Sequence, residues 1–320
     1  MRVLAFTLVF WASSVAAQQL QLRMPVDCVL GETCFFQNYV DRDPGPEYRE
    51  FGCGQLSYDG HRGTDIALYD HIAMDQGVNV RAAADGIVAA TRDGMPDILV
   101  TDPNAPDVTG RACGNAVIID HLDGWQTRYC HMKRGSLRVK TGVVVTTDTV
   151  LGQVGLSGST EFPHLHISVF KDDVLVDPFQ PDPNATCGAA INPLWIDPID
   201  YVAGGILSTG FSPAVPSFED IKIGTASTQD LPATAPALVL WTHIFGGQTG
   251  DVVAFEISGP QGPFLTQTVL LKRTQSRLFR ATGRKRTAQT WPVGRYSGVA
   301  TLTRDGVEIS RQTASLMVTE

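Results

Sequence analysis

The 320-residue sequence lacks several patterns, and each absence excludes a class of protein. It has no Gly-X-Y period, no coiled-coil heptad and no solenoid repeat, which excludes fibrous and repeat architectures. Beyond the N-terminus, no apolar run reaches the length of about 20 residues that spans a bilayer, so no stable membrane insertion is expected. The cysteines show no CxxC spacing, which argues against a cysteine-rich metal site. A full-length amphipathic helix is also missing, so a mainly helical fold is not expected.

What remains is the composition of an ordinary globular protein. Hydrophobic residues make up 43% and charged residues 18% of the chain, which excludes a disordered protein. The length allows two domains, each with its own core. Because the 31 glycines and 19 prolines are scattered along the chain, they favour many short strands joined by turns.

The first seventeen residues have the pattern of a signal peptide. Arg2 gives a positive start, residues 3–11 are apolar, and residues 15–17 are small. We predict cleavage after Ala17 and export of the mature chain, either to the periplasm or out of the cell.

Six cysteines remain after this cleavage, and an even number in an exported protein indicates disulfides. Six cysteines allow 15 pairings, so sequence cannot fix them. The preferred pairs are Cys28–Cys34, which closes a small loop, Cys113–Cys130, which would cross a hairpin, and Cys53–Cys187, which would join the front of a domain to its end.

The composition then divides the chain. Residues 18–57 are irregular and turn-rich and are predicted to be a disulfide-pinned N-terminal segment. Residues 58–205 carry most histidines and several β-branched, alternating runs, including a hairpin with its turn at residues 122–124. Residues 206–216 are predicted to be a linker, and residues 217–320 an immunoglobulin-like β-sandwich, because short alternating runs are separated by turns. The expected fold class is all-β.

A basic stretch, Lys272–Arg286, stands out against the net charge of −8. We interpret it first as the solvated face of a hairpin. The alternative is a surface for anionic cell-wall polymers or nucleic acid. No nucleic-acid fold motif accompanies the stretch, so nucleic acid is not expected to be a partner.

Three histidine motifs carry the chemistry. His164 and His166 are two residues apart on a predicted strand, so both imidazoles point to one face. His61 and Asp65 form an HxxxD motif that flanks the start of another strand. His131 ends the second strand of the hairpin. Each motif alone has an ordinary structural explanation, but two histidines, one carboxylate and an open fourth position make a catalytic zinc site.

Together these motifs resemble a known family. The segments GHRGTD, GNAVIIDH…TRYCHM and GQVGLSGSTEFPHLHISV, over about residues 58–180, are similar in order and spacing to the lysostaphin-type (LytM-like) zinc endopeptidases. The resemblance implies a mainly antiparallel β fold with a groove, one zinc ion, and cleavage of peptides in bacterial peptidoglycan. Carried over by motif, the implied metal ligands are His61, Asp65 and His166, and the implied catalytic residues are His131 and His164.

Several features depart from the family or stay open. An acidic, turn-rich insertion at residues 93–111 is expected to lengthen the rim of the groove, and Tyr58 either lines the groove or packs at a strand edge. His71, His121 and His243 are interpreted as structural. The C-terminal sandwich is not a usual wall-binding module, and an unknown envelope partner is one possibility for it.

Three other functions compete with the enzyme. A metal-free relative would bind the wall and activate another hydrolase, but such relatives lose ligands that are all present here. An Fe(II) oxygenase would also use two histidines and a carboxylate. An envelope interaction protein would use the sandwich as its active part and the first domain as a scaffold.

Overall fold

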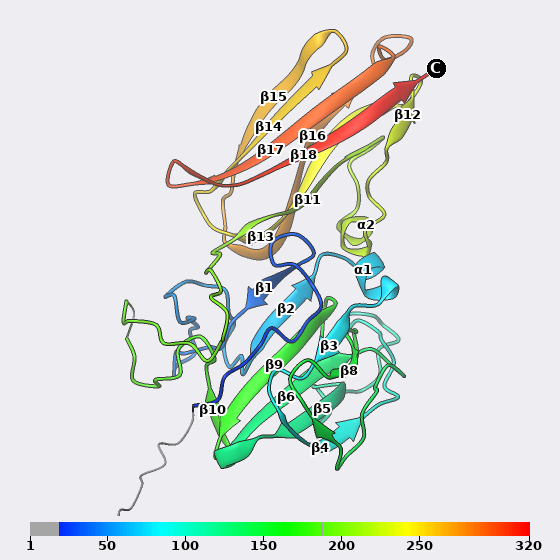
Figure 1. The fold of residues 1–320 in the computed structure, drawn as a ribbon. Helices are drawn as coiled ribbons and strands as arrows, with labels where there is room; N and C mark the ends of the chain where they lie inside the picture. The colour runs from blue at the N-terminus through cyan, green and yellow to red at the C-terminus, as the bar shows by residue number, and fades with distance from the viewer. Residues whose placement is uncertain (1–18, 187) are drawn as a thin grey trace, which may run out of the picture.

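The computed structural model describes residues 19–186 and 188–320, so the predicted signal peptide and Cys187 lie outside the described residues. Antiparallel sheets dominate, as expected, and they form two domains that follow one another along the chain (Figure 1). Within the described ranges, no helix is long and apolar enough to cross a membrane. The prediction of a third disulfide includes Cys187 and therefore stays a prediction.

The N-terminal domain is built on one antiparallel sheet with the order β1-β2-β9-β6-β5-β4-β7, and β10 pairs with the outer part of β9. A separate two-stranded sheet joins β3 and β8. The strands are β1 (Cys34–Asn38), β2 (Thr64–Leu68), β3 (Asn79–Arg81), β4 (Gly86–Arg92), β5 (Asn115–Asp120), β6 (Trp125–Met132), β7 (Val144–Val145), β8 (Val150–Gln153), β9 (His164–Lys171) and β10 (Val174–Val176). The short helices are α1 (His71–Gln76) and the 3-10 turn Leu122–Gly124.

Strand β9 shows why the sheet forms in this register. Its apolar residues Leu165, Ile167 and Val169 alternate with polar ones and are completely buried in the core. The polar residues of the opposite face include His164 and His166. A shift of one residue would exchange the two faces, so the apolar alternation fixes where the histidines point.

The N-terminal segment is more regular than predicted. The disulfide Cys28–Cys34 is confirmed. Immediately after it, however, β1 pairs with β2 and becomes the edge strand of the main sheet. Leu22 is also fully buried in the core of this domain. Of the described residues 19–57, residues 34–38 therefore belong to the sheet, whereas residues 39–57 are irregular and turn-rich as expected.

The predicted hairpin is confirmed. Strands β5 and β6 pair antiparallel, and the turn lies at residues 122–124. The predicted disulfide Cys113–Cys130 is also confirmed. The residues between 79 and 92 form two strands, β3 and β4, which belong to different sheets.

The C-terminal domain begins earlier than predicted. Residues 206–216 were expected to be a linker, yet β11 (Gly205–Ser212) pairs along its length with β13 (Ala237–Gly247). The prediction was wrong because glycine and serine suggested a flexible segment, while Ile206, Leu207 and Phe211 are in fact buried.

The remaining elements complete a β-sandwich. One sheet has the order β11-β13-β16 and the other β12-β18-β17-β14-β15, with apolar residues of both in one core. This arrangement matches the expected immunoglobulin-like sandwich. The other elements are α2 (Phe218–Ile223), β12 (Asp230–Pro232), β14 (Val252–Gly259), β15 (Gly262–Leu270), β16 (Gln275–Lys285), β17 (Gly294–Arg304) and β18 (Val307–Thr319).

The two domains are packed against each other. Phe245 of β13 lies in the core of the N-terminal domain, with its ring centre 4.7 Å from that of Phe35 on β1. Arg304 donates a hydrogen bond to the carbonyl of Ala203, with a distance of 3.1 Å. Figure 1 shows the lower end of the sandwich lying directly over β1 and β2. The C-terminal domain is therefore placed beside the edge of the sheet that carries the histidine motifs.

Candidate metal centre

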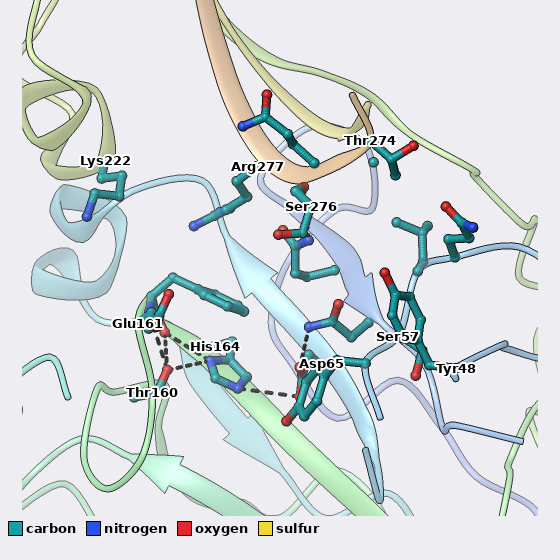
Figure 2. Close-up of a pocket in the computed structure, with 18 of the residues that line it drawn as sticks. Tyr48, Ser57, Asp65, Thr160, Glu161, His164, Lys222, Thr274, Ser276 and Arg277 are labelled. Carbon is teal, nitrogen blue, oxygen red and sulfur yellow. Dashed lines mark hydrogen bonds and ion pairs between the residues drawn. The ribbon is translucent and has the colours of Figure 1, made fainter. Parts of the chain in front are cut away.

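A cleft of about 660 Å³ lies where the two domains meet. Asp65 and His164 lie in its wall (Figure 2). Residues of β1, the loop before β2 and the loop before β9 line the N-terminal side, while α2 and the segment 274–277 line the C-terminal side. The groove expected for the first domain is thus closed on one side by the second domain.

The register between β2 and β9 builds the centre of the site. Asp65 lies directly opposite His166, and Ala67 lies opposite His164. Because residues two apart on a strand share a face, both imidazoles project on the same side as the carboxylate. His166 Nδ1 is 2.8 Å from Asp65 Oδ1.

His61 enters from the loop before β2. Its Nε2 lies 3.2 Å from Asp65 Oδ1 and 3.2 Å from His166 Nδ1. Gly63, between the two members of the HxxxD motif, lies against the His166 ring, and a Cβ there would collide with that ring and with the Ile167 carbonyl. The glycine of this motif therefore makes room for His166.

Other hydrogen bonds determine which nitrogen of each ring faces the centre. His61 Nδ1 donates to the Tyr39 carbonyl at 2.7 Å, so its Nε2 carries a lone pair. His166 Nε2 donates to Ser168 Oγ at 3.0 Å, and that hydroxyl donates to the Arg62 carbonyl, so His166 Nδ1 carries a lone pair. These outer contacts fix the imidazole tautomers as they do in metal sites.

When His61 and His166 are neutral, three acceptor atoms therefore face one another. Ligand atoms of a tetrahedral zinc site, with bonds of about 2.0–2.1 Å, lie about 3.3 Å apart. The three separations of 2.8, 3.2 and 3.2 Å approach that spacing. Two imidazoles and a carboxylate are also ligands that zinc prefers. His61, Asp65 and His166 could hold a divalent metal ion.

The carboxylate of Asp65 is prepared for this contact. Its second oxygen accepts a hydrogen bond of 2.8 Å from the amide of Asn38 on β1. Burial opposes ionisation, but the neighbouring imidazoles of His61 and His164 hold the pKa of Asp65 well below its usual value. Asp65 is consequently ionised at neutral pH and oriented by β1.

His131 and His164 lie beside the three acceptors, with their ring centres 4.6 Å apart. His131 Nδ1 donates to the Ser157 carbonyl at 2.8 Å, which leaves a lone pair on Nε2. Burial and then the nearby His164 and His166 lower the pKa of His131 well below its ordinary value, so this ring is neutral.

His131 occupies an unusual backbone position. Its φ is 59°, in the left-handed region that few residues other than glycine, asparagine and aspartate adopt. Cys113, which forms a disulfide with the neighbouring Cys130, holds this backbone position, because its carbonyl accepts a hydrogen bond of 2.8 Å from the His131 amide. The hairpin disulfide therefore holds the end of β6 where His131 turns toward the site.

His164 has two different neighbours. Its Nδ1 donates to the Phe162 carbonyl at 2.9 Å, and its Nε2 lies 3.4 Å from Asp65 Oδ1. The hydrogen bond to Phe162 orients the ring, so that Nε2 faces the carboxylate of Asp65.

The structure brings all five predicted site residues together, and a second group of three histidines, His131, His164 and His166, could also hold a metal. That second group is less compact, because its His131 and His166 ring centres lie 5.9 Å apart, whereas those of His61 and His166 lie 5.0 Å apart. We therefore favour the group that contains Asp65.

Sequence reasoning missed the residues that support these side chains. Ser168 could have been found, because it follows His166 by two residues and shares its face of β9. Asn38 and the Tyr39 carbonyl gave no signal, because they lie in a segment interpreted as irregular.

The structure also locates Tyr58, the insertion and the three histidines outside the site. Tyr58 and Val100, the latter from the insertion, line the cleft, which agrees with a lengthened rim. His121 is structural, with hydrogen bonds to the Asp85 carbonyl and the Thr127 hydroxyl. His71 and His243 belong to neither group of possible metal ligands.

Comparisons with known proteins identify relatives of the N-terminal domain. Residues 59–178 match the model of the family described as Peptidase family M23. The chain is 32% identical over 111 residues to the cell division protein DipM of Caulobacter vibrioides, covering 35% of this chain and 15% of DipM. It is 33% identical over 106 residues to the peptidoglycan DD-endopeptidase ShyA of Vibrio cholerae, covering 33% of this chain and 19% of ShyA.

Among solved structures, the catalytic domain of the prophage-encoded M23 protein EnpA from Enterococcus faecalis aligns with a TM-score of 0.32 and 21% identity, covering 50% of this chain and 96% of that domain. The chain spans less than a fifth of the length of either curated relative, so the similarity concerns one domain. Residues 59–178 of this chain form a domain of peptidase family M23.

Proposed function

We propose that this chain is an exported zinc metalloendopeptidase that hydrolyses peptide bonds in the cross-links of bacterial peptidoglycan. The observation that carries the proposal is the meeting of three acceptor atoms, from His61, Asp65 and His166, at separations of 2.8–3.2 Å. The name of the relative ShyA supports peptidoglycan as the substrate class.

In this proposal His61, Asp65 and His166 hold one zinc ion. When bound, zinc supplies a Lewis acid for the scissile carbonyl and lowers the pKa of a bound water to about 7. The open side of the site faces the cleft, where a peptide can lie against the loops before β2 and β9.

In this proposal the two other histidines, His131 and His164, assist the attack of water on the peptide bond. His131 is neutral with a lone pair on Nε2, so it accepts the proton of the attacking water and passes it to the leaving amine. His164, whose Nε2 lies 3.4 Å from Asp65 Oδ1, hydrogen-bonds the attacking water or the oxygen on which negative charge develops. The carbonyls of Ser157 and Phe162 accept a hydrogen bond from Nδ1 of His131 and of His164, respectively, and so orient both rings.

Incubating the zinc-loaded protein with purified peptidoglycan tests the proposal directly. We expect soluble peptides whose masses identify the bond that was cut. Chelation should stop their release, and added zinc should restore it, because the ion supplies the Lewis acid. Metal analysis of the protein as purified separates zinc from iron, the metal of the competing oxygenase function. Bound zinc without release from any wall preparation would contradict the enzyme and favour a wall-binding role.

The proposed export has its own test. The two confirmed disulfides are typical of an oxidising compartment. The mature protein recovered from the cell envelope or medium should begin at Gln18, as read by N-terminal sequencing. A full-length chain that retains Met1 and stays in the cytoplasm would contradict export.

A further inference from the structure

Arg277 is a charged residue of the cleft that has no role in the proposed reaction. It comes from β16 of the C-terminal sandwich and belongs to the basic stretch noted in the sequence. That stretch was expected to be a solvated hairpin face, but β16 pairs with β13 and Arg277 turns into the cleft. Figure 2 shows Arg277 across the pocket from Asp65 and His164.

Two donors of the Arg277 guanidinium, Nε and Nη2, are buried and make no hydrogen bond with any of the described residues. Burial lowers the pKa of Arg277 to about 10, and no acidic neighbour offsets that effect. Buried donors of a charged group are costly when they stay unpaired, so they call for an acceptor supplied from elsewhere.

Aromatic rings hold this guanidinium in place. Its central carbon lies 4.6 Å from the centre of the Phe162 ring and 5.4 Å from that of Phe35. The same Phe162 ring stacks on His164, with a centre-to-centre distance of 4.4 Å. The two rings thus hold Arg277 in place at the cleft, while its buried Nε and Nη2 donors stay without an acceptor among the described residues.

The distance to the metal centre fits a peptide. The contacts of 4.6 Å and 4.4 Å in series place the guanidinium at most about 9 Å from the His164 ring, a distance that no more than three residues of an extended chain span at about 3.3 Å each. The other cation of the cleft, Lys222, is already paired with Glu219 at 2.6 Å. His243, which packs on Phe218 of the cleft wall, is kept neutral by burial and by the charge of Arg277, so it adds no charge beside the cleft.

We infer that Arg277 is a specificity determinant that binds a free carboxylate of the peptide substrate, no more than three residues from the scissile bond. A carboxylate matches the fork of N–H donors in a bidentate way. The C-terminal sandwich therefore completes the substrate cleft of the N-terminal domain. This inference rests on the proposed function for its substrate, but its binding test does not require hydrolysis.

Binding is measured with two probes, acetyl-D-alanyl-D-alanine and its C-terminal amide, titrated into the full-length mature protein by NMR. A chelator is present throughout, so that no metal can hold the carboxylate. The wild type should bind the free acid at least about tenfold more tightly than the amide, as for a charge-assisted hydrogen-bonded pair. Arg277→Met should reduce this ratio to about one.

Arg284→Met is the matched control. It removes the same charge from the same strand, and Arg284 also stacks on an aromatic ring, that of Phe264, at 5.0 Å, but it does not line the cleft. The acid-to-amide ratio should stay at its wild-type value. Arg277→Lys, which keeps the charge but not the fork, should give an intermediate ratio.

A structural role for Arg277 predicts a different result. Because its buried donors are unpaired, Arg277→Met should melt at or above the wild-type temperature. A wild-type ratio near one, undetectable binding of the acid, or an Arg277→Met ratio equal to that of Arg284→Met would overturn the inference. Failure to release wall peptides with an intact binding ratio would instead count against the proposed function alone.

Discussion

Replacing His166 with alanine should abolish both the release of peptides and the retention of zinc. His166 Nδ1 lies 3.2 Å from His61 Nε2 and 2.8 Å from Asp65 Oδ1, so its loss leaves only two of the three ligands. Loss of an outer contact to a metal ligand costs about 10–100-fold in affinity, and loss of the ligand itself should exceed this range. Zinc content by mass spectrometry and affinity by competition with a chelating dye measure the effect.

Two further variants serve as comparisons for the loss of zinc expected in His166→Ala. Ser168→Ala removes the hydroxyl that accepts from His166 Nε2, so it should weaken zinc binding by about 10–100-fold without abolishing it. His121→Gln removes a histidine outside the site and should keep one zinc per chain. If His166→Ala retains zinc as tightly as His121→Gln, the assignment of this ligand is wrong.

Replacing His131 should separate chemistry from metal binding. We expect His131→Asn to keep one zinc per chain and to lose about 10²–10⁴-fold in the rate of peptide release, the usual contribution of a general acid–base group. Asparagine is chosen because it tolerates the left-handed backbone at this position, where φ is 59°. His131→Ala should behave alike in rate and be less stable, since alanine adopts that conformation at a cost of about 1–2 kcal/mol.

The same variants test the second group of possible ligands. If the ion were held by His131, His164 and His166, His131→Asn would lose zinc together with activity. Thermal unfolding of each variant, with and without zinc, shows whether a lost ion reflects a lost ligand or an unfolded domain.

The five site residues could be predicted because their signals are local. The alternation of apolar and polar residues in β9 fixes the face to which His164 and His166 point. The HxxxD motif places His61 and Asp65 only four residues apart. Their order along the chain, with His131 at the end of a hairpin, supplied the resemblance that assigned their roles. The disulfides Cys28–Cys34 and Cys113–Cys130 followed from the same local pattern.

The features that sequence reasoning missed depend on contacts between distant segments. Asn38 orients Asp65 only because β1 pairs with β2, and nothing in a turn-rich segment indicates that pairing. β11 was predicted to be a linker because its glycines and serines are typical of flexible segments, although its apolar residues are buried. Arg277 looked like one of several solvated charges, and only the packing of the sandwich on the first domain turns it into the cleft. Contacts between domains produce no periodic pattern in the sequence, so they could not be predicted from it.

The central claim is that three side chains share one zinc ion. A crystal of the zinc-loaded protein, with anomalous diffraction measured on both sides of the zinc absorption edge, tests it most directly. We predict one peak at about 2.0–2.2 Å from His61 Nε2, Asp65 Oδ1 and His166 Nδ1, with the fourth position open to the cleft. A peak held instead by His131 and His164, or no peak in a correctly folded and zinc-saturated crystal, would contradict the account.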